Sequence, residues 1–102
     1  MIALSGFDWD DGNREKCQRH GVTIGEIEAL FVGRPQVAND PLHSDLEDRF
    51  IAVGRNQTGR PLFVAFTFRT FEGIQRIRPV SARYMHNKEA LRYGQASSGT
   101  EN

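Results

Sequence analysis

Apolar and polar residues alternate along three neighbouring stretches in the second half of the chain, and this pattern predicts three β-strands. We expect the strands over residues 49–55, 61–69 and 74–82, and the short turns between them favour an antiparallel meander. The middle stretch has apolar side chains at both odd and even positions, so it should be central in the sheet. Pro79 lacks a backbone N–H, which places the third strand at an edge or marks a β-bulge.

The first part of the chain combines a short strand pattern with a helix pattern. Residues 4–9 alternate loosely and predict a short strand. Asp10 or Asp11 is expected to cap a first helix that runs to about His20, and Gly21 then stops it. This arrangement puts His20 at a sharp corner before the next helix.

The second helix has the clearest local signals in the sequence. Thr23 and Glu26 have the spacing of a capping box, and Gly33 followed by Pro35 ends the helix. Apolar side chains recur between these signals at helical spacing, at Ile24, Ile27, Leu30 and Phe31. Such a stripe is expected to pack against the core of the domain.

Two further elements complete the predicted fold. Val37 is expected to begin a short strand, and a last helix is capped by Asn87 and closed by Gly94. Residues 95–102 are rich in Ser, Gly and Thr and are expected to be disordered. The sequence therefore predicts an α+β fold, a single domain over residues 1–94 with helices packed on one face of a small, mainly antiparallel sheet.

Charge is unevenly distributed along the chain, although the formal net charge is zero. Residues 1–48 hold four basic and ten acidic side chains, whereas residues 49–96 hold nine basic and two acidic ones. One interpretation is that the two halves neutralise each other through weak surface pairs. The other is that the basic half presents a local anion-binding face. Charge alone favours neither.

Several classes of protein and of site are not indicated. No apolar run approaches the roughly 20 residues that span a bilayer, and a single cysteine, Cys17, agrees with a reducing compartment, so we expect a cytoplasmic protein. His20, His43 and His86 are too far apart in sequence to predict a metal site. No nucleophile motif or glycine-rich phosphate loop is present, so Cys17 is interpreted as an apolar filler and no cofactor is expected.

The remaining polar residues suit cleavage of RNA without a metal. Such a reaction needs a base for the 2′-hydroxyl proton, an acid for the leaving 5′-oxygen and cations for the charge on phosphorus. His20 can exchange a proton near neutral pH, and the second half of the chain supplies arginines and two tyrosines, Tyr84 and Tyr93.

Each of these residues also has a purely structural interpretation. His20 could interact with the C-terminus of its own helix. Two arginines of the third strand could keep a sheet edge soluble, Arg76 and Arg78. Arg83 could form an ion pair with a carboxylate near the start of the first helix, Asp8 or Asp10.

A set of short motifs in a fixed order resembles the BrnT family of type II toxins. The blocks Trp-Asp, His-Gly-Val and Ser-Ala-Arg are the most specific ones. The resemblance extends over Phe7-Asp8-Trp9-Asp10, Asn13, Lys16, Arg19-His20-Gly21-Val22, Glu26, Phe31, Asp40, His43, Glu47-Asp48-Arg49, Phe66-Thr67-Phe68-Arg69, Ile77-Arg78-Pro79-Val80-Ser81-Ala82-Arg83, Glu89 and Tyr93.

The resemblance implies a RelE-like fold with two N-terminal helices and one C-terminal helix. It also implies a ribonuclease that stalls translation and is neutralised by a BrnA-type antitoxin. In such a pair, the antitoxin carries the ribbon-helix-helix part that binds operator DNA, so the toxin meets DNA only through its partner.

Family positions transfer to this chain residue by residue. The catalytic positions fall on His20, Arg69 and Arg83, and contacts to the RNA are expected from Lys16, Arg19, Arg76, Arg78 and Tyr84. This chain departs from the family pattern at two places. Arg19 stands where the family usually has lysine, and arginine does not deprotonate to act as a base. Pro79 stands where an aliphatic residue is usual.

Two functions therefore compete. The first is a metal-independent ribonuclease in which Arg69, Arg83 and His20 share one pocket. The second is a non-catalytic module whose basic sheet face binds an acidic peptide of a partner. Both use the same arginines, and the position of these side chains decides whether the shared pocket exists.

Overall fold

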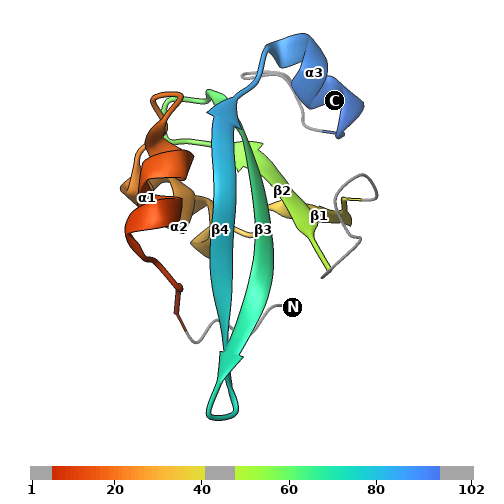
Figure 1. Ribbon diagram of the computed structural model, residues 1–102. Coiled ribbons are helices and arrows are strands. Elements are labelled where there is room, and N and C mark those ends of the chain that lie inside the picture. Colours follow the sequence, from red (N-terminus) through yellow and green to blue (C-terminus); the bar gives the residue numbers. More distant parts are fainter. Residues whose placement is uncertain (1–5, 41–47, 95–102) are drawn as a thin grey trace.

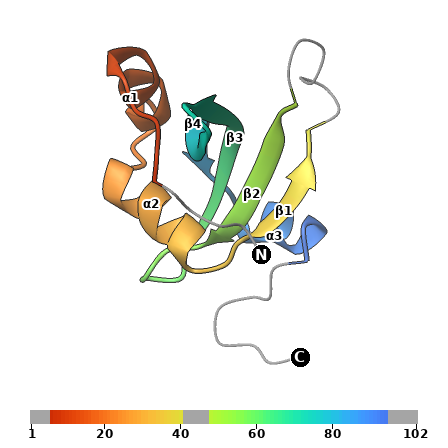
Figure 2. The same cartoon turned by 90° about the horizontal axis from the view of Figure 1, so that it is seen from below.

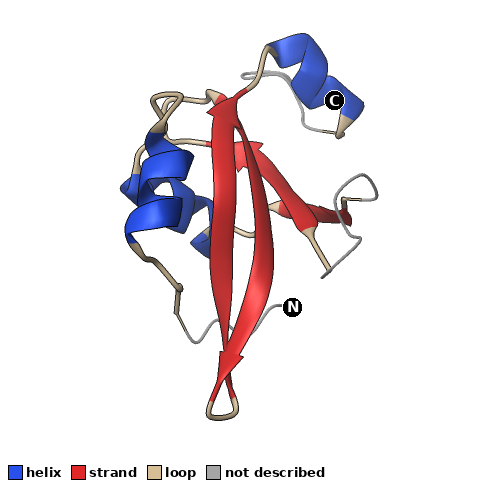
Figure 3. Ribbon diagram, viewed as in Figure 1, coloured by secondary structure: helices blue, strands red, loops and turns tan. Residues whose placement is uncertain are grey.

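The computed structural model describes residues 6–40 and 48–94 and contains a four-stranded sheet with three helices (Figures 1 and 3). The helices are α1 (Asp11–Gln18), α2 (Ile24–Val32) and α3 (Asn87–Arg92). The strands are β1 (Gln36–Asn39), β2 (Phe50–Arg55), β3 (Pro61–Phe71) and β4 (Ile74–Tyr84). The expected α+β fold is confirmed. The predicted tail, 95–102, and His43 lie outside the described residues.

The sheet is an antiparallel meander in the order β1-β2-β3-β4. The predicted meander of three strands is therefore confirmed, and β3 pairs with a strand on each side. The short strand that Val37 was expected to begin is β1, which pairs with the far side of β2.

The β3–β4 hairpin is longer than the sequence predicted and extends beyond the rest of the sheet (Figure 1). Its two strands pair as far as Phe71 and Ile74, so only Glu72 and Gly73 form the turn. Both turn residues have positive φ, 52° and 80°, which is the backbone of the tight hairpin turns that fit the twist of a two-stranded ribbon.

A β-bulge interrupts the pairing of β3 with β4. Phe66 pairs with Pro79, but the preceding residue, Ala65, pairs with Ser81, so Val80 is the extra residue on β4. The prediction of an edge strand or a bulge at Pro79 is confirmed. An extra residue also reverses which face of the sheet the following side chains occupy.

The main core lies between one face of the sheet and the first two helices (Figure 2). Phe66 is fully buried at its centre, with edge-to-face contact to Phe31 of α2 at 4.8 Å between ring centroids. Cys17 of α1 is fully buried in the same core, so its interpretation as an apolar filler is confirmed.

A smaller core lies on the opposite face of the sheet. Val53 and Phe63 are cross-strand partners on this face, and they pack with Met85 and with Ala90 and Tyr93 from the α3 region. The expectation that all helices share one face is therefore wrong. In the sequence, β3 has apolar side chains on both of its faces, so a helix can pack on either face, and the fold places α3 on the face opposite α1 and α2.

Helix boundaries agree with the local signals at α2 and differ at the other two helices. The capping box of Thr23 and Glu26 is present. Asp10 caps α1, which ends at Gln18, before the expected corner at His20. His86, not Asn87, is the N-cap of α3, and its side chain makes no capping hydrogen bond.

The predicted first strand over residues 4–9 is not found in its described part. Phe7 forms one isolated parallel bridge to Ile77, and the Asp8 backbone N–H donates to the Ile77 carbonyl at 2.8 Å. This segment runs beside β4 without becoming a strand. Residues 4 and 5 lie outside the described residues.

Candidate functional site

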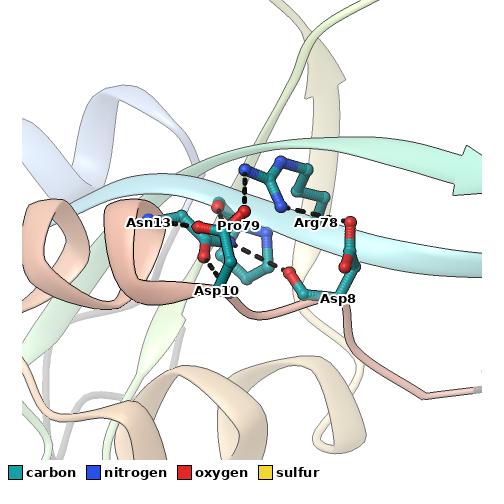
Figure 4. A network of polar contacts seen from close by, with 5 residues as sticks. All are labelled: Asp8, Asp10, Asn13, Arg78 and Pro79. Carbon is teal, nitrogen blue, oxygen red and sulfur yellow. Dashed lines mark hydrogen bonds and ion pairs between the residues drawn. The ribbon is translucent and has the colours of Figure 1, made fainter.

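Arg78 is a structural arginine that fastens the start of α1 to β4. Its guanidinium donates to the carboxylates of Asp8 at 3.1 Å and Asp10 at 2.8 Å (Figure 4). The backbone N–H of Asn13 and the Arg78 guanidinium together lower the pKa of Asp10. The carboxylates that we had considered as alternative partners of Arg83 thus belong to Arg78. The expected contact of Arg78 with RNA would have to compete with both.

Asn13 completes this network. Its side-chain amide donates to the backbone carbonyls of Asp8 at 3.0 Å and Pro79 at 2.8 Å, and its oxygen accepts from the Asp10 N–H at 2.7 Å (Figure 4). The bond to Pro79 is buried. One side chain therefore joins the N-terminal segment, α1 and the bulged part of β4.

Arg83 lies on the α3 side of the sheet. Its guanidinium forms two hydrogen bonds with the Glu89 carboxylate, at 3.0 and 2.7 Å, and stacks on the Phe63 ring, 4.4 Å from its centroid. These hydrogen bonds lower the pKa of Glu89. Arg83 fixes α3 to the sheet, and its charge is already matched by a carboxylate.

Arg69 and Arg76 lie at the other end of β3 and β4. They are direct cross-strand partners. Arg83 pairs with Phe63, which is six positions from Arg69 along β3, a separation of roughly 20 Å. No side chain reaches across that distance, so Arg69 and Arg83 cannot bind the same phosphate.

The expectation of one shared pocket for His20, Arg69 and Arg83 is therefore wrong. Arg69 and Arg83 each lie near the C-terminal end of a strand. Consecutive antiparallel strands have their C-terminal ends at opposite ends of the sheet. His20 follows α1, which packs on the other face of the sheet from Arg83. The residues lie on one domain but not around one point.

The structure instead brings polar residues together where β4 ends beside the β2–β3 turn. The Tyr84 hydroxyl donates to the Glu26 carboxylate at 2.8 Å, and the Arg60 guanidinium stacks on the Tyr84 ring, 3.6 Å from its centroid. The Glu26 bond raises the pKa of Tyr84, so the phenol stays protonated at neutral pH. Tyr84 is therefore suited to positioning Arg60 rather than to accepting a proton.

A hollow of about 490 Å³ opens at this end of the sheet. Arg60, Tyr84 and His86 line it together with Thr58, Gly59, Pro61, Met85 and Asn87. It thus combines an exposed cation with an exposed imidazole. Sequence reasoning missed Arg60 and gave His86 no role, because neither residue belongs to a motif and their neighbours come from the β2–β3 turn.

A second hollow of about 590 Å³ lies on the other side of the same turn. Its lining includes the Glu26 carboxylate, which accepts hydrogen bonds from Asn56 and from the Thr23 N–H. Burial raises the pKa of Glu26, but these bonds and the one from Tyr84 lower it by more, so the group is ionised at neutral pH. Arg55 also lines this hollow, so its cation stands with a fixed negative charge, whereas the hollow at His86 is lined, among the described residues, by Arg60 and by no acidic residue and is therefore the better anion site.

The other predicted site residues lie on or just after α1. Lys16, Arg19 and His20 are all exposed. The residue after His20, Gly21, has its carbonyl oxygen 3.5 Å from the Tyr84 hydroxyl, so the His20 corner adjoins a residue that lines the hollow. Of the predicted site residues, Tyr84 thus contacts the backbone of the residue that follows His20.

Neither a cluster of metal-ligating side chains nor a helix that could span a membrane is found in the described part of the chain. Within residues 6–40 and 48–94, no three His, Cys, Asp or Glu side chains gather into a possible metal site. None of the three helices is long and apolar enough to cross a bilayer.

Comparison with known proteins identifies the family. No curated protein matches the chain. Residues 9–89 match the family described as the ribonuclease toxin BrnT of type II toxin-antitoxin systems. This range holds α1, α2, the whole sheet and the residues that line the hollow. Because the match covers well over half of its 102 residues, the chain belongs to the BrnT family of ribonuclease toxins.

Proposed function

We propose that this toxin is a metal-independent endoribonuclease of the cytoplasm that inhibits translation by cleaving RNA and is neutralised by a BrnA-type antitoxin. We further propose that its fold is RelE-like and that it reaches operator DNA only through that antitoxin. The observation that carries the enzymatic part is the hollow shared by Arg60, Tyr84 and His86 in a chain of a ribonuclease family.

In the proposed reaction, a base removes the proton of a 2′-hydroxyl, and this oxygen forms a bond to the neighbouring phosphorus. The bond from phosphorus to the 5′-oxygen breaks, and an acid protonates that oxygen. The products are a 2′,3′-cyclic phosphate and a 5′-hydroxyl. No metal is needed where fixed cations stabilise the charge on phosphorus.

The chain supplies a group for each task at the end of the sheet. Arg60 binds the phosphate in the hollow, because its guanidinium is held in place by the Tyr84 ring. His86 and His20 are the two proton-transfer groups, one in the hollow and one at the adjoining corner. Lys16 and Arg19 would contact the RNA backbone beside that corner.

Arg83 takes a different part in this proposal from the one expected from the sequence. Its ion pair with Glu89 fixes α3, and the N-cap residue of α3 is His86. Arg83 is therefore a positioning residue for His86. Its loss should reduce the rate through misplacement of the imidazole, not through loss of a phosphate contact.

The test uses purified full-length protein and an RNA oligonucleotide with chelator present. His86→Asn removes the imidazole and introduces a residue that is favoured at a helix N-cap, where His86 makes no side-chain capping bond, so the start of α3 should not be destabilised. We expect its cleavage rate to fall by on the order of 10² to 10⁴. His20→Asn, the matched change at the corner, distinguishes the two histidines.

Three results would each contradict part of the proposed function. Full activity of both variants would remove the histidines from the reaction. Loss of activity only in His20→Asn would move the proton transfer from the hollow to the corner. RNA that stays intact with the wild-type protein, together with tight antitoxin binding, would favour the non-catalytic module that binds an acidic peptide.

A further inference from the structure

The tip of the β3–β4 hairpin exposes two large apolar side chains. Phe71 is 57% exposed and Ile74 is 44% exposed, and the two residues pair directly across the strands. Apolar side chains that are exposed next to each other and rimmed by polar ones are a feature of binding sites, unlike apolar side chains scattered singly. We call residues 69–76 the hairpin arm.

Arginines stand next to this apolar pair on the same side of the hairpin. Arg69 and Arg76 are the cross-strand pair two positions from Phe71 and Ile74, and side chains two positions apart share a face. Among the described contacts, the half-buried Arg76 side chain has no acidic partner. A bound anion would match the charge of Arg76.

We propose that the hairpin arm binds a single-stranded segment of the RNA substrate, with a base stacked on Phe71 and a backbone phosphate at Arg76. The inference rests on the proposed function for the identity of the substrate. An exposed aromatic ring beside a cation is the combination that binds single-stranded nucleic acid, because every base has a face to stack and every nucleotide has a phosphate. A purely apolar partner would not match the arginines, and an ion alone would not match Phe71.

The arm lies far from the hollow. Ile74 and Tyr84 are ten positions apart on β4, roughly 30 Å along the strand. The arm would therefore contact nucleotides well removed from the scissile bond. It should increase affinity for long RNA and have no effect on an oligonucleotide too short to reach from the hollow to Phe71.

Glu72 at the turn is the one acidic residue of the arm. It would oppose a nearby phosphate through a solvent-exposed and salt-screened repulsion. Glu72→Gln is therefore expected to strengthen RNA binding slightly, by about twofold. Binding of a partner peptide rich in arginine or lysine would instead be weakened by Glu72→Gln.

The test measures binding of a fluorescent single-stranded 2′-O-methyl RNA of about 30 nucleotides by anisotropy. This probe lacks the free 2′-hydroxyl that the proposed reaction needs, so full-length wild-type protein can be used. We expect Phe71→Ala to weaken binding about tenfold, since one stacked base contributes roughly that much, and Phe71→Tyr to keep it. Val32→Ala, which changes an apolar side chain that is 71% exposed on α2, is the matched control.

Salt dependence provides a second measurement. Arg76→Ala should reduce the slope of log affinity against log salt by about 0.7, the value for one lost phosphate contact on a single strand. Arg92→Ala on α3 removes an exposed charge away from the arm and should leave the slope unchanged. The thermal midpoint of each variant checks that the fold is intact.

Equal binding by Phe71→Ala, Arg76→Ala and their controls would overturn the inference. If the wild-type protein still cleaves RNA in that case, only the inference about the hairpin arm is wrong, and the proposed function is unaffected. If the wild-type protein neither binds nor cleaves RNA, both fail. Loss of antitoxin binding in Phe71→Ala with RNA binding unchanged would also overturn the inference and identify the arm as a protein interface.

Discussion

Asn13 offers the sharpest test of how the molecule is assembled, because one buried amide joins three segments. The change Asn13→Ala removes its hydrogen bonds to the carbonyls of Asp8 and Pro79 and the bond from the Asp10 N–H. It leaves the Pro79 carbonyl buried without its side-chain donor. Since α1 leads to the His20 corner, the same change should also make the position of His20 in the proposed active site less fixed.

The magnitude follows from these three bonds. A buried acceptor that loses its donor costs about 1 to 3 kcal/mol, and each of the two less buried bonds contributes about 0.5 to 1.5 kcal/mol. Alanine recovers at most about 0.7 kcal/mol of helix propensity. We therefore expect Asn13→Ala to lower the free energy of unfolding by roughly 2 to 4 kcal/mol, a large part of the total for a domain of this size.

Urea denaturation followed by circular dichroism measures this change. For a slope of about 1 to 1.5 kcal/mol per molar urea, the midpoint should fall by about 2 M. Asn13→Asp keeps the size and the acceptor oxygen but has no donor at neutral pH, so it should be at least as destabilising. Gln18→Ala on the same helix is the control, because its amide bonds to the Arg14 carbonyl in an exposed position.

A free energy of unfolding of Asn13→Ala within about 0.5 kcal/mol of the wild-type value would refute this reasoning, since it would mean that water replaces the amide without cost. Wild-type stability of Asn13→Asp would likewise show that the two donated bonds contribute little. A large effect of Gln18→Ala would show that α1 is sensitive to any change.

Three further predictions concern acid, thiol reactivity and the turn. The free energy of unfolding should fall as the pH drops below about 4.5, the ordinary pKa of a glutamate, and should continue to fall through the lowered folded-state pKa of Glu89. Glu89→Gln should make this loss of stability at acid pH smaller. An unchanged loss in urea titrations at several pH values would contradict the prediction. Burial raises the pKa of Cys17 to about 11. A thiol reagent at pH 8 should therefore modify the native protein only as fast as the protein unfolds. Labelling within seconds would show that the core is open to the reagent. Glu72→Asn should stabilise the hairpin by about 0.5 kcal/mol, because asparagine tolerates a φ of 52° better, and a lower thermal midpoint would exclude this explanation.

The sequence determined the local structure and the family. The capping box of Thr23 and Glu26, the meander with β3 at its centre and the irregularity at Pro79 all follow from signals within a few residues, and all are present. Hydrogen bonds of caps and the two-residue period of strands act over such short ranges. The ordered motifs in the same way indicated a BrnT toxin, and the match over residues 9–89 confirms it.

The tertiary structure alone decided where the charged side chains meet. If β4 alternated without interruption, residue 83 would share the face of Ile77 and lie toward α1 and α2, on the side of His20. The bulge at Val80 shifts the alternation by one, so Arg83 points to α3 and pairs with Glu89. Pro79 indicated an edge strand or a bulge, but the position of the extra residue depends on how two whole strands pair, which no short stretch of sequence fixes.

The same reason explains the site that the sequence did not predict. Arg60 comes from a turn, Tyr84 from the end of β4 and His86 from the start of α3, and they become neighbours only when β3 and β4 are in register. Local sequence signals therefore supplied the elements and the chemistry that they can perform. The pairing of distant segments selected which arginine and which histidine share a hollow, because that pairing depends on contacts between residues far apart in the chain.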